Sequence, residues 1–340
     1  MTLTQQQATA AAVDQWITGI PGRIQGPAIF VENPDHAPYA KKLADRDATV
    51  LVLGGDAGDH TIVPVSGAFA ETGEELLIDG SLSLEIQDYV AIPFINLVGV
   101  TVVRMTTRED WQAFFDDADA ARSSGHFIQQ LTEVNAVLAE RALLSGLATH
   151  SLVMPRLHIT GDGRILNGPY GTRIGQVGDP LHDLRLRSLA LHPESSVAAV
   201  SEPGDIRRLL RERPWLPRYL AALDAWKFIP REERAATQLV GFGRSLYGAL
   251  DSSSTASPDA PFILHRGGEH TLLDPKTGRL FKIGKDAATI VEAVSNLQDF
   301  NTAAILAAPA LGVPAAQAES SVRAVVAQFD QLGIDILGVR

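Results

Sequence analysis

The chain has 340 residues, 45% of them hydrophobic and 20% charged, which is typical of a globular protein with room for two domains. It contains no cysteine, which excludes disulfides, a cysteine nucleophile and cysteine-ligated metal centres. The net charge of −11 disfavours nucleic acids and anionic membranes as partners, because both are negatively charged.

No segment has the run of about 18 apolar residues that a membrane span requires. The longest candidate, residues 89–103, is interrupted by Pro93, Asn96 and Gly99. Residues 1–12 lack the basic and apolar regions of a secretory signal. We therefore expect a cytoplasmic protein with no membrane partner.

Residues 1–250 predict a mixed α/β region. Short apolar runs at 28–31, 48–53, 61–65 and 75–78 indicate buried strands, and residues 157–166 predict a hairpin with Asp162-Gly163 in its turn. The spacing of apolar residues predicts helices over 108–121, 128–147, 206–228 and 238–250. The two prolines 214 and 217 interrupt the third of these.

Residues 1–250 show no strong catalytic motif, since neither G-x-S-x-G nor H-E-x-x-H occurs. His265 and His270 can face each other across a hairpin, but no third metal ligand follows at a suitable spacing. We expect no metal and no other cofactor. A basic and aromatic cluster is read either as an interface or as the solvated face of a helix; its members are Arg207, Arg208, Arg211, Arg213, Trp215, Arg218, Tyr219 and Trp226.

The clearest boundary is the segment 251–261, which is small, polar and broken by proline. This composition predicts a flexible linker between a domain at 1–250 and a second domain at 262–340. The alternative is a long surface loop within one domain.

The second domain reads as three strands followed by three helices. The strands are expected at 262–264, 271–273 and 279–283, with a tight turn at 274–278 that supplies Pro, Asp and Gly. Apolar residues spaced along one face predict a helix from about residue 286 to 297, a short helix at 302–308 and a third helix at 315–332. The apolar stripe of the third helix is Val322, Val325, Val326, Phe329 and Leu332.

This arrangement resembles the PqqD-like family, the recognition element that binds leader peptides during the biosynthesis of ribosomally synthesised and modified peptides (RiPPs). The resemblance rests on the turn 274–278, the strand Arg279-Leu280-Phe281-Lys282-Ile283 and the closing helix that ends Phe329…Leu332-Gly333-Ile334. It covers under a quarter of the chain. The order of the whole chain is similar to the RiPP recognition proteins of daptide biosynthesis. The expected fold class is α+β, with a mixed α/β N-terminal region and a winged-helix module of a three-stranded antiparallel sheet and three helices.

The resemblance implies a non-catalytic protein that binds the leader of a precursor peptide as an added strand on residues 279–283. An unpaired strand edge suits this role physically, because its free N–H and C=O groups pair with a guest chain. The resemblance also implies that residues 1–250 dock a modifying enzyme of the dehydrogenase type, which decarboxylates the peptide. The candidate peptide-binding residues are Arg279, Leu280, Phe281, Lys282, Ile283, Val322, Arg323, Val326 and Phe329. Gln328 is the alternative candidate to Val326.

Three alternatives stay open. Leu280, Phe281, Val322 and Phe329 fit plain core packing as well as ligand contact. The chain fits an enzyme whose active site lies in 1–250 and whose second domain recruits the substrate. A winged-helix transcription regulator is least favoured, because residues 262–340 carry seven basic against eight acidic side chains.

Overall fold

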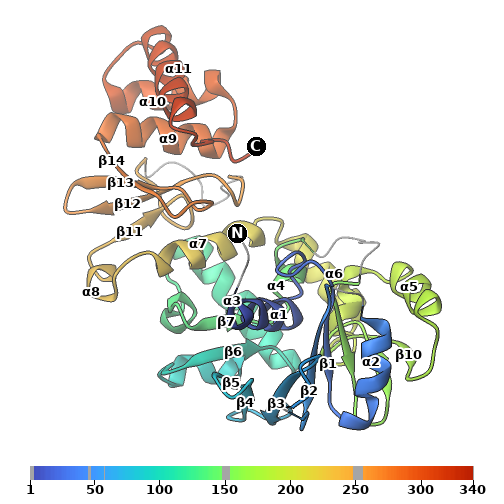
Figure 1. Cartoon of the computed structure of the whole chain (residues 1–340). Coiled ribbons are helices and arrows are strands. Elements are labelled where there is room, and N and C mark those ends of the chain that lie inside the picture. Colours follow the sequence, from blue (N-terminus) through green and yellow to red (C-terminus); the bar gives the residue numbers. More distant parts are fainter. Residues whose placement is uncertain (1–3, 45–46, 57, 148–153, 248–255, 340) are drawn as a thin grey trace. The chain divides into compact units, whose positions relative to one another are not determined.

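The computed structural model describes residues 4–44, 47–56, 58–147, 154–247 and 256–339 (Figure 1). Its internal contacts divide the chain into two compact units. The first contains residues 1–114 and 135–213, and the second contains 115–134 and 214–340. The chain is thus not divided at the segment 251–261, because residues on both sides of that segment belong to the second unit.

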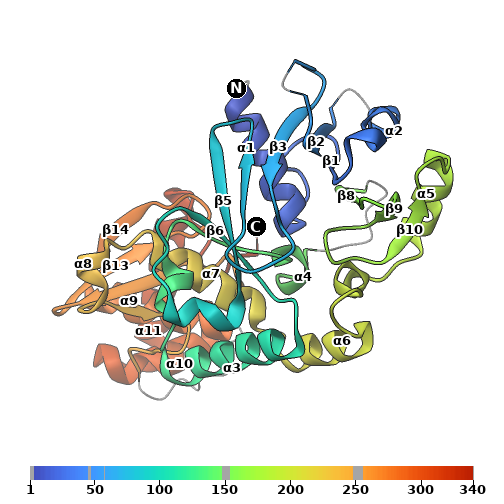
Figure 2. The same ribbon diagram turned by 90° about the horizontal axis from the view of Figure 1, so that it is seen from below.

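In the described part of the chain, the first unit is built on a mixed ten-stranded sheet of order β10-β9-β8-β1-β2-β3-β4-β5-β6-β7 (Figure 2). The neighbours β8, β1, β2 and β3 pair in parallel, as do β5, β6 and β7. The strands are β1 (Ala28–Val31), β2 (Thr49–Leu53), β3 (Val63–Gly67), β4 (Glu75–Ile78), β5 (Leu82–Asp88), β6 (Val100–Arg104), β7 (Ala136–Leu138), β8 (Arg156–Ile159), β9 (Arg164–Leu166) and β10 (Arg173–Gln176).

Helices cover both faces of this sheet, which explains why its central strands read as continuous apolar runs. On one face, Trp16 of α1 stacks on Phe30 of β1 with 4.3 Å between ring centroids. On the other face, α2 and α5 pack Ala40 and Leu184 against the strands. The helices are α1 (Gln5–Thr18), η1 (Pro34–His36), α2 (Ala37–Leu43), η2 (Tyr89–Phe94), α4 (Arg141–Leu144), α5 (Leu181–Leu189), η4 (Pro193–Val197) and α6 (Pro203–Glu212). The longer α3 (Arg108–Ser124) begins in the first unit and ends in the second.

The second unit contains an antiparallel sheet of order β11-β12-β13-β14. Its strands are β11 (Gln238–Val240), β12 (Phe262–Arg266), β13 (Glu269–Leu273) and β14 (Leu280–Ile283). Its helices are η3 (Gln129–Thr132), α7 (Leu216–Lys227), α8 (Arg231–Arg234), α9 (Lys285–Leu297), α10 (Phe300–Leu311) and α11 (Ala315–Gln331). The three expected strands and three expected helices after residue 261 are therefore present.

Within the described residues this sheet has four strands, so the expected three-stranded sheet is wrong by one strand. The additional strand, β11, lies where a helix over 238–250 was predicted. Gly241 and Gly243 follow it with φ of 106° and 68°, values that a helix does not accommodate. Residues 248–250 of that predicted helix lie outside the described residues.

The two faces of this sheet are covered by different parts of the chain. On one face, Val240, Ile263 and Leu272 occupy adjacent positions and share a core with α9, α10 and α11. On the opposite face, Phe262 and Leu273 are fully buried, and the Arg218 guanidinium of α7 stacks on the Phe262 ring at 3.5 Å. Figure 1 shows α9 and α7 on opposite sides of the strands.

The expected linker is only partly described, because residues 251–255 lie outside the described residues. In the remainder, Ala256 and Ala260 are buried, and four of the segment's carbonyls, those of Ser257, Pro258, Ala260 and Pro261, accept hydrogen bonds from Arg218. This half of the segment is therefore packed into the second unit. No described helix is long and apolar enough to cross a membrane.

Most of the other strands and helices expected in residues 1–250 are present, but one more expected helix is not. The strands at 28–31 and 75–78 are confirmed, as are the hairpin at 157–166 and the helix beginning at 108. The predicted helix over 128–147 is wrong. That stretch contains η3, the strand β7 and the one-turn helix α4, because β7 pairs in parallel with β6.

Candidate functional site at the free edge of β14

The β13–β14 hairpin is set by its turn. Asp274 accepts hydrogen bonds through its carboxylate from the Lys276 N–H at 3.1 Å and from the Thr277 hydroxyl at 2.5 Å. Gly278 then takes a φ of 67°, which returns the chain for β14. The Asp274 N–H donates to the Arg279 carbonyl at 3.0 Å, which fixes the register of the two strands.

That register decides which backbone groups of β14 are used. In antiparallel pairs, residues alternate between those that bond the neighbouring strand and those whose N–H and C=O point away from it. Because Arg279 bonds Asp274, the residues Phe281 and Ile283 also face β13. Leu280 and Lys282 therefore direct their backbone groups to the other side. Among the described residues, β14 has β13 as its only strand neighbour, so this outer side forms a free edge.

Side chains of β14 alternate between the two faces of the sheet. Phe281 and Ile283 lie on the face of α9, half-buried against the helical core. Arg279 is exposed on the same face. Its guanidinium donates to the Leu332 carbonyl at the end of α11 at 2.8 Å and lies 4.9 Å from the centre of the Phe281 ring. The Arg279 side chain thus connects the free edge with the end of α11.

Leu280 and Lys282 lie on the opposite face. Leu280 is 51% exposed, although its neighbours in the same row, Leu273 and Phe262, are fully buried. Lys282 pairs with Glu269 at 2.7 Å, and this contact lowers the pKa of the Glu269 carboxyl. Both partners are well exposed, so their ion pair contributes little to stability.

The expected residues of α11 divide into two groups. Val322 and Phe329 are buried in the core of the second unit, where they support the helix and have no free surface for a guest. Val326 is half-buried against the same core. Arg323 is exposed and pairs with Glu319 one turn earlier, at 2.8 Å.

Two apolar side chains beside the edge were not predicted. Phe228, at the end of α7, is 46% exposed and lies against Gly278, where a Cβ would be 2.7 Å from its ring. Leu332, at the end of α11, is also 46% exposed. The sequence gives only a weak signal for Phe228, because it lies about 50 residues from β14 and is brought there by the fold.

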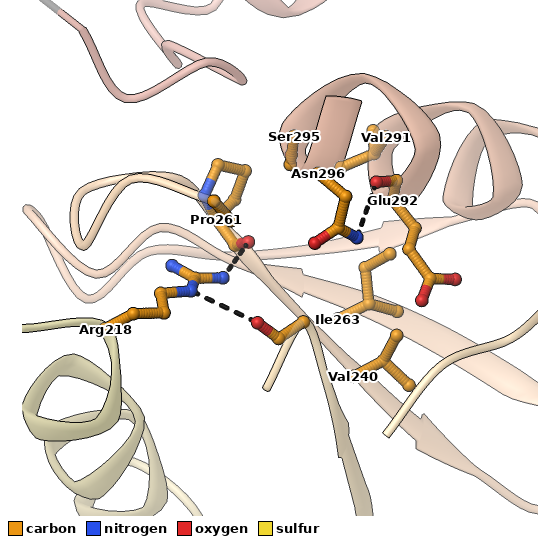
Figure 3. Close-up of a pocket in the computed structure, with 10 residues that line it drawn as sticks. Arg218, Val240, Pro261, Ile263, Val291, Glu292, Ser295 and Asn296 are labelled. Atoms are coloured by element: carbon orange, nitrogen blue, oxygen red, sulfur yellow. Dashed lines mark hydrogen bonds between the residues drawn. The ribbon is translucent and has the colours of Figure 1, made fainter. Parts of the chain in front are cut away.

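The second unit also contains a small cavity between α9, the sheet and residues 256–261 (Figure 3). Arg218 and Glu292 lie on its wall with Ser295 and Asn296, and its volume of about 10 Å³ is enough for a single water molecule. Burial lowers the pKa of Arg218 to about 9 and raises that of Glu292 to about 7. This cavity is too small for a cofactor.

The basic and aromatic cluster between Arg207 and Trp226 contains both exposed and buried side chains. Arg208 and Arg211 are exposed on α6. Arg218 and Tyr219 are buried, and Arg218 instead holds the backbone of the packed segment 256–261. The buried members therefore serve packing within the second unit.

His265 and His270 face each other on β12 and β13 as expected, with ring centroids 4.7 Å apart. The pKa of His270 is lowered, mainly by burial and to a smaller extent by the nearby His265 and Lys285. The described residues contain no group of three or more side chains placed to bind a metal ion.

The first unit contains one polar pair of chemical interest. Glu32 follows β1, and its Oε1 lies 2.9 Å from Nε2 of the buried His158 in β8. The hydrogen bond with His158 lowers the pKa of Glu32. The Nδ1 atom of His158 is buried and has no hydrogen-bond partner among the described residues. The pair lies near the carboxyl ends of two parallel strands, where open α/β sheets bind ligands.

No family model, no curated protein and no solved structure matches this chain. The free edge of β14 and the Glu32–His158 pair are therefore interpreted from their geometry alone.

Proposed function

We propose that this protein is a non-catalytic adaptor that binds the leader of a ribosomal precursor peptide as a fifth strand on β14 and delivers it to a modifying enzyme. The free edge of β14 is the observation that carries the proposal. The PqqD-like order of strands and helices supports it. A modifying enzyme of the dehydrogenase type, docked on the first unit, is the partner that the resemblance suggests.

The edge sets the strength of binding. Leu280 and Lys282 together offer two N–H and two C=O groups, hence about four main-chain hydrogen bonds at about 1 kcal/mol each. That sum corresponds to a dissociation constant near 1 mM. Micromolar affinity therefore requires side-chain contacts in addition to the main chain.

A proline substitution separates strand addition from other modes of binding. Lys282→Pro removes an N–H that points away from β13, so the sheet keeps its bonds while the guest strand loses one and meets a proline ring. We expect peptides selected from a displayed random library on the full-length protein to bind below about 100 μM and to bind Lys282→Pro at least about tenfold more weakly. Fluorescence anisotropy measures both constants.

Two further variants serve as controls. Lys282→Ala keeps the N–H and loses the charge, which isolates the contribution of the side chain. Phe281→Pro removes an N–H that faces β13, and urea unfolding should show a clear loss of stability for this variant alone. If Lys282→Pro binds the selected peptides as well as Lys282→Ala does, strand addition on β14 is disproved.

The Glu32–His158 pair favours a second candidate, an enzyme active site in the first unit. His158 is buried, whereas the Glu32 side chain that it holds is 40% exposed, so the Glu32 carboxylate is the group placed to act as a general base. Incubation of the full chain with a bound peptide, followed by mass spectrometry, tests this candidate. A mass change that is lost in Glu32→Gln would support an enzyme and oppose the adaptor.

A further inference from the structure

This inference rests on the proposed function and concerns what the guest chain must look like. Three exposed cations lie along the edge strand: Arg279 precedes it on the face of α9, Lys285 follows it at the start of α9, and Lys282 lies on the opposite face and pairs with Glu269. The chain as a whole is strongly acidic, with a net charge of −11. This local excess of positive charge favours a guest with acidic side chains.

The apolar part of the surface lies on the face away from α9. Phe228 ends α7, and Arg218 of that helix packs on Phe262, which lies in the cross-strand row of Leu280 on the face away from α9. The Phe228 ring packs against Gly278, and Leu280, two residues further along the chain, is exposed. We call Phe228 and Leu280 the far-face step. An apolar side chain of a guest strand beside β14 would cover both residues.

The face of α9 offers less to an apolar guest side chain. Phe281 and Ile283 are already half-buried there by the helical core. The Arg279 side chain extends over the Phe281 ring to the end of α11, which covers part of this face with a charged group. Leu332 is the exposed apolar residue at that end.

We infer that the guest is an extended segment in which apolar residues alternate with acidic ones, and that its apolar side rests on the far-face step formed by Phe228 and Leu280. Phe228 belongs to the part of the second unit that precedes β11. Specificity is therefore shared between the terminal strands and helices and the end of α7.

Synthetic peptides test the class of guest on the full-length protein. The probes are three fluorescein-labelled peptides of equal length, with leucine alternating with glutamate, leucine alternating with lysine, and serine alternating with glutamate. We expect the leucine–glutamate peptide to bind at least about tenfold more tightly than either of the others. Equal binding of the lysine and glutamate peptides, or failure of the leucine–glutamate peptide to bind below about 1 mM, would overturn the inference.

Two matched variants locate the apolar contact. Phe228→Ala and Leu332→Ala each remove a side chain that is 46% exposed, at the end of α7 and of α11 respectively. We expect Phe228→Ala to weaken the leucine–glutamate peptide about tenfold and Leu332→Ala to change it less than about twofold. The reverse pattern would place the guest against α11 and reject the far-face step.

The outcomes for the two proposals are distinguishable. If Lys282→Pro weakens binding while Phe228→Ala does not, strand addition holds and the far-face step fails. If Phe228→Ala weakens binding while Lys282→Pro matches Lys282→Ala, the peptide binds without joining the sheet, and the proposed function fails. Urea unfolding of Phe228→Ala checks that the variant remains folded.

Discussion

At the scale of single residues, the second unit contains an acid that is poorly matched to its surroundings. Glu292 of α9 is 2% exposed, and its oxygens accept from the Leu246 N–H at 2.9 and 3.2 Å. Burial outweighs these bonds and raises the pKa of the carboxyl from 4.5 to about 7. The acid therefore holds residues 245–247 against α9 at a cost that depends on pH.

The sign of that dependence follows from the raised pKa. Folding favours the protonated acid, so its contribution is complete below pH 4.5 and is lost as the pH rises through 7. The loss amounts to about 3 kcal/mol. We expect Glu292→Gln to be more stable than the parent at pH 8 and to lack this loss between pH 5 and 8. Urea unfolding between pH 5 and 8 measures the free energy of unfolding of both proteins. Glu319→Gln, at a side chain that is 42% exposed, is the control. An unchanged pH profile in Glu292→Gln would refute the assignment.

At the scale of elements, the turn between β13 and β14 packs against the end of α7. Gly278 has a φ of 67°, and a Cβ there would lie 2.7 Å from the Phe228 ring. The position thus requires glycine for two independent reasons, backbone conformation and space. The same contact places Phe228 beside the start of β14.

Substitution of this glycine separates the two reasons. We expect Gly278→Ala to lower the free energy of unfolding by about 2 kcal/mol, from the strain of positive φ and from the clash with Phe228. In the background Phe228→Ala, the clash disappears, and the cost of Gly278→Ala should fall to about 1 kcal/mol. Equal costs in the two backgrounds, measured by urea unfolding, would show that the ring does not contact the turn.

Local patterns in the sequence correctly predicted the helices that pack through a regularly spaced apolar stripe, and the turn that Pro and Gly favour. The stripe from Ala287 to Leu297 and the stripe of α11 correspond to observed helices, and the Pro and Gly of residues 274–278 form the observed turn. The sequence failed where distant segments decide the structure. β7 is a strand because it pairs with β6, and β11 is a strand because it pairs with β12. Spacing within a segment carries no information about such partners.

The candidate site shows the same limit. Residues 279–283 were predicted as an edge strand, and β14 is one. Which of its residues point outward depends on the bond between Asp274 and Arg279, which is a property of the folded hairpin. The burial of Val322 and Phe329 and the position of Phe228 likewise depend on packing between helices and turns that are far apart in sequence.

At the scale of the whole molecule, the two units are interleaved in sequence. The chain passes between them at residues 114–115, 134–135 and 213–214. The second unit therefore depends on segments from two separate parts of the chain, 115–134 and 214–340. Phe127, for example, stacks on Tyr219 of α7 with 5.9 Å between ring centroids.

This interleaving predicts how fragments behave. A fragment of residues 262–340 lacks β11, Arg218 and Phe228, so one strand and the cover over Phe262 are lost. We expect it to unfold at lower urea concentration than a fragment of residues 214–340, or to remain unfolded, as followed by circular dichroism. Equal midpoints would mean that the terminal strands and helices are an independent folding unit.

The free edge of β14 has one more consequence. Unsatisfied main-chain groups accept any extended chain, including β14 from a second copy of the same protein, and such pairing is the first step of edge-to-edge aggregation. Where two such strands pair with Lys282 opposite Lys282, the two exposed ammonium groups repel each other and oppose self-association. Lys282 therefore acts as a gatekeeper against pairing of this edge with its own kind.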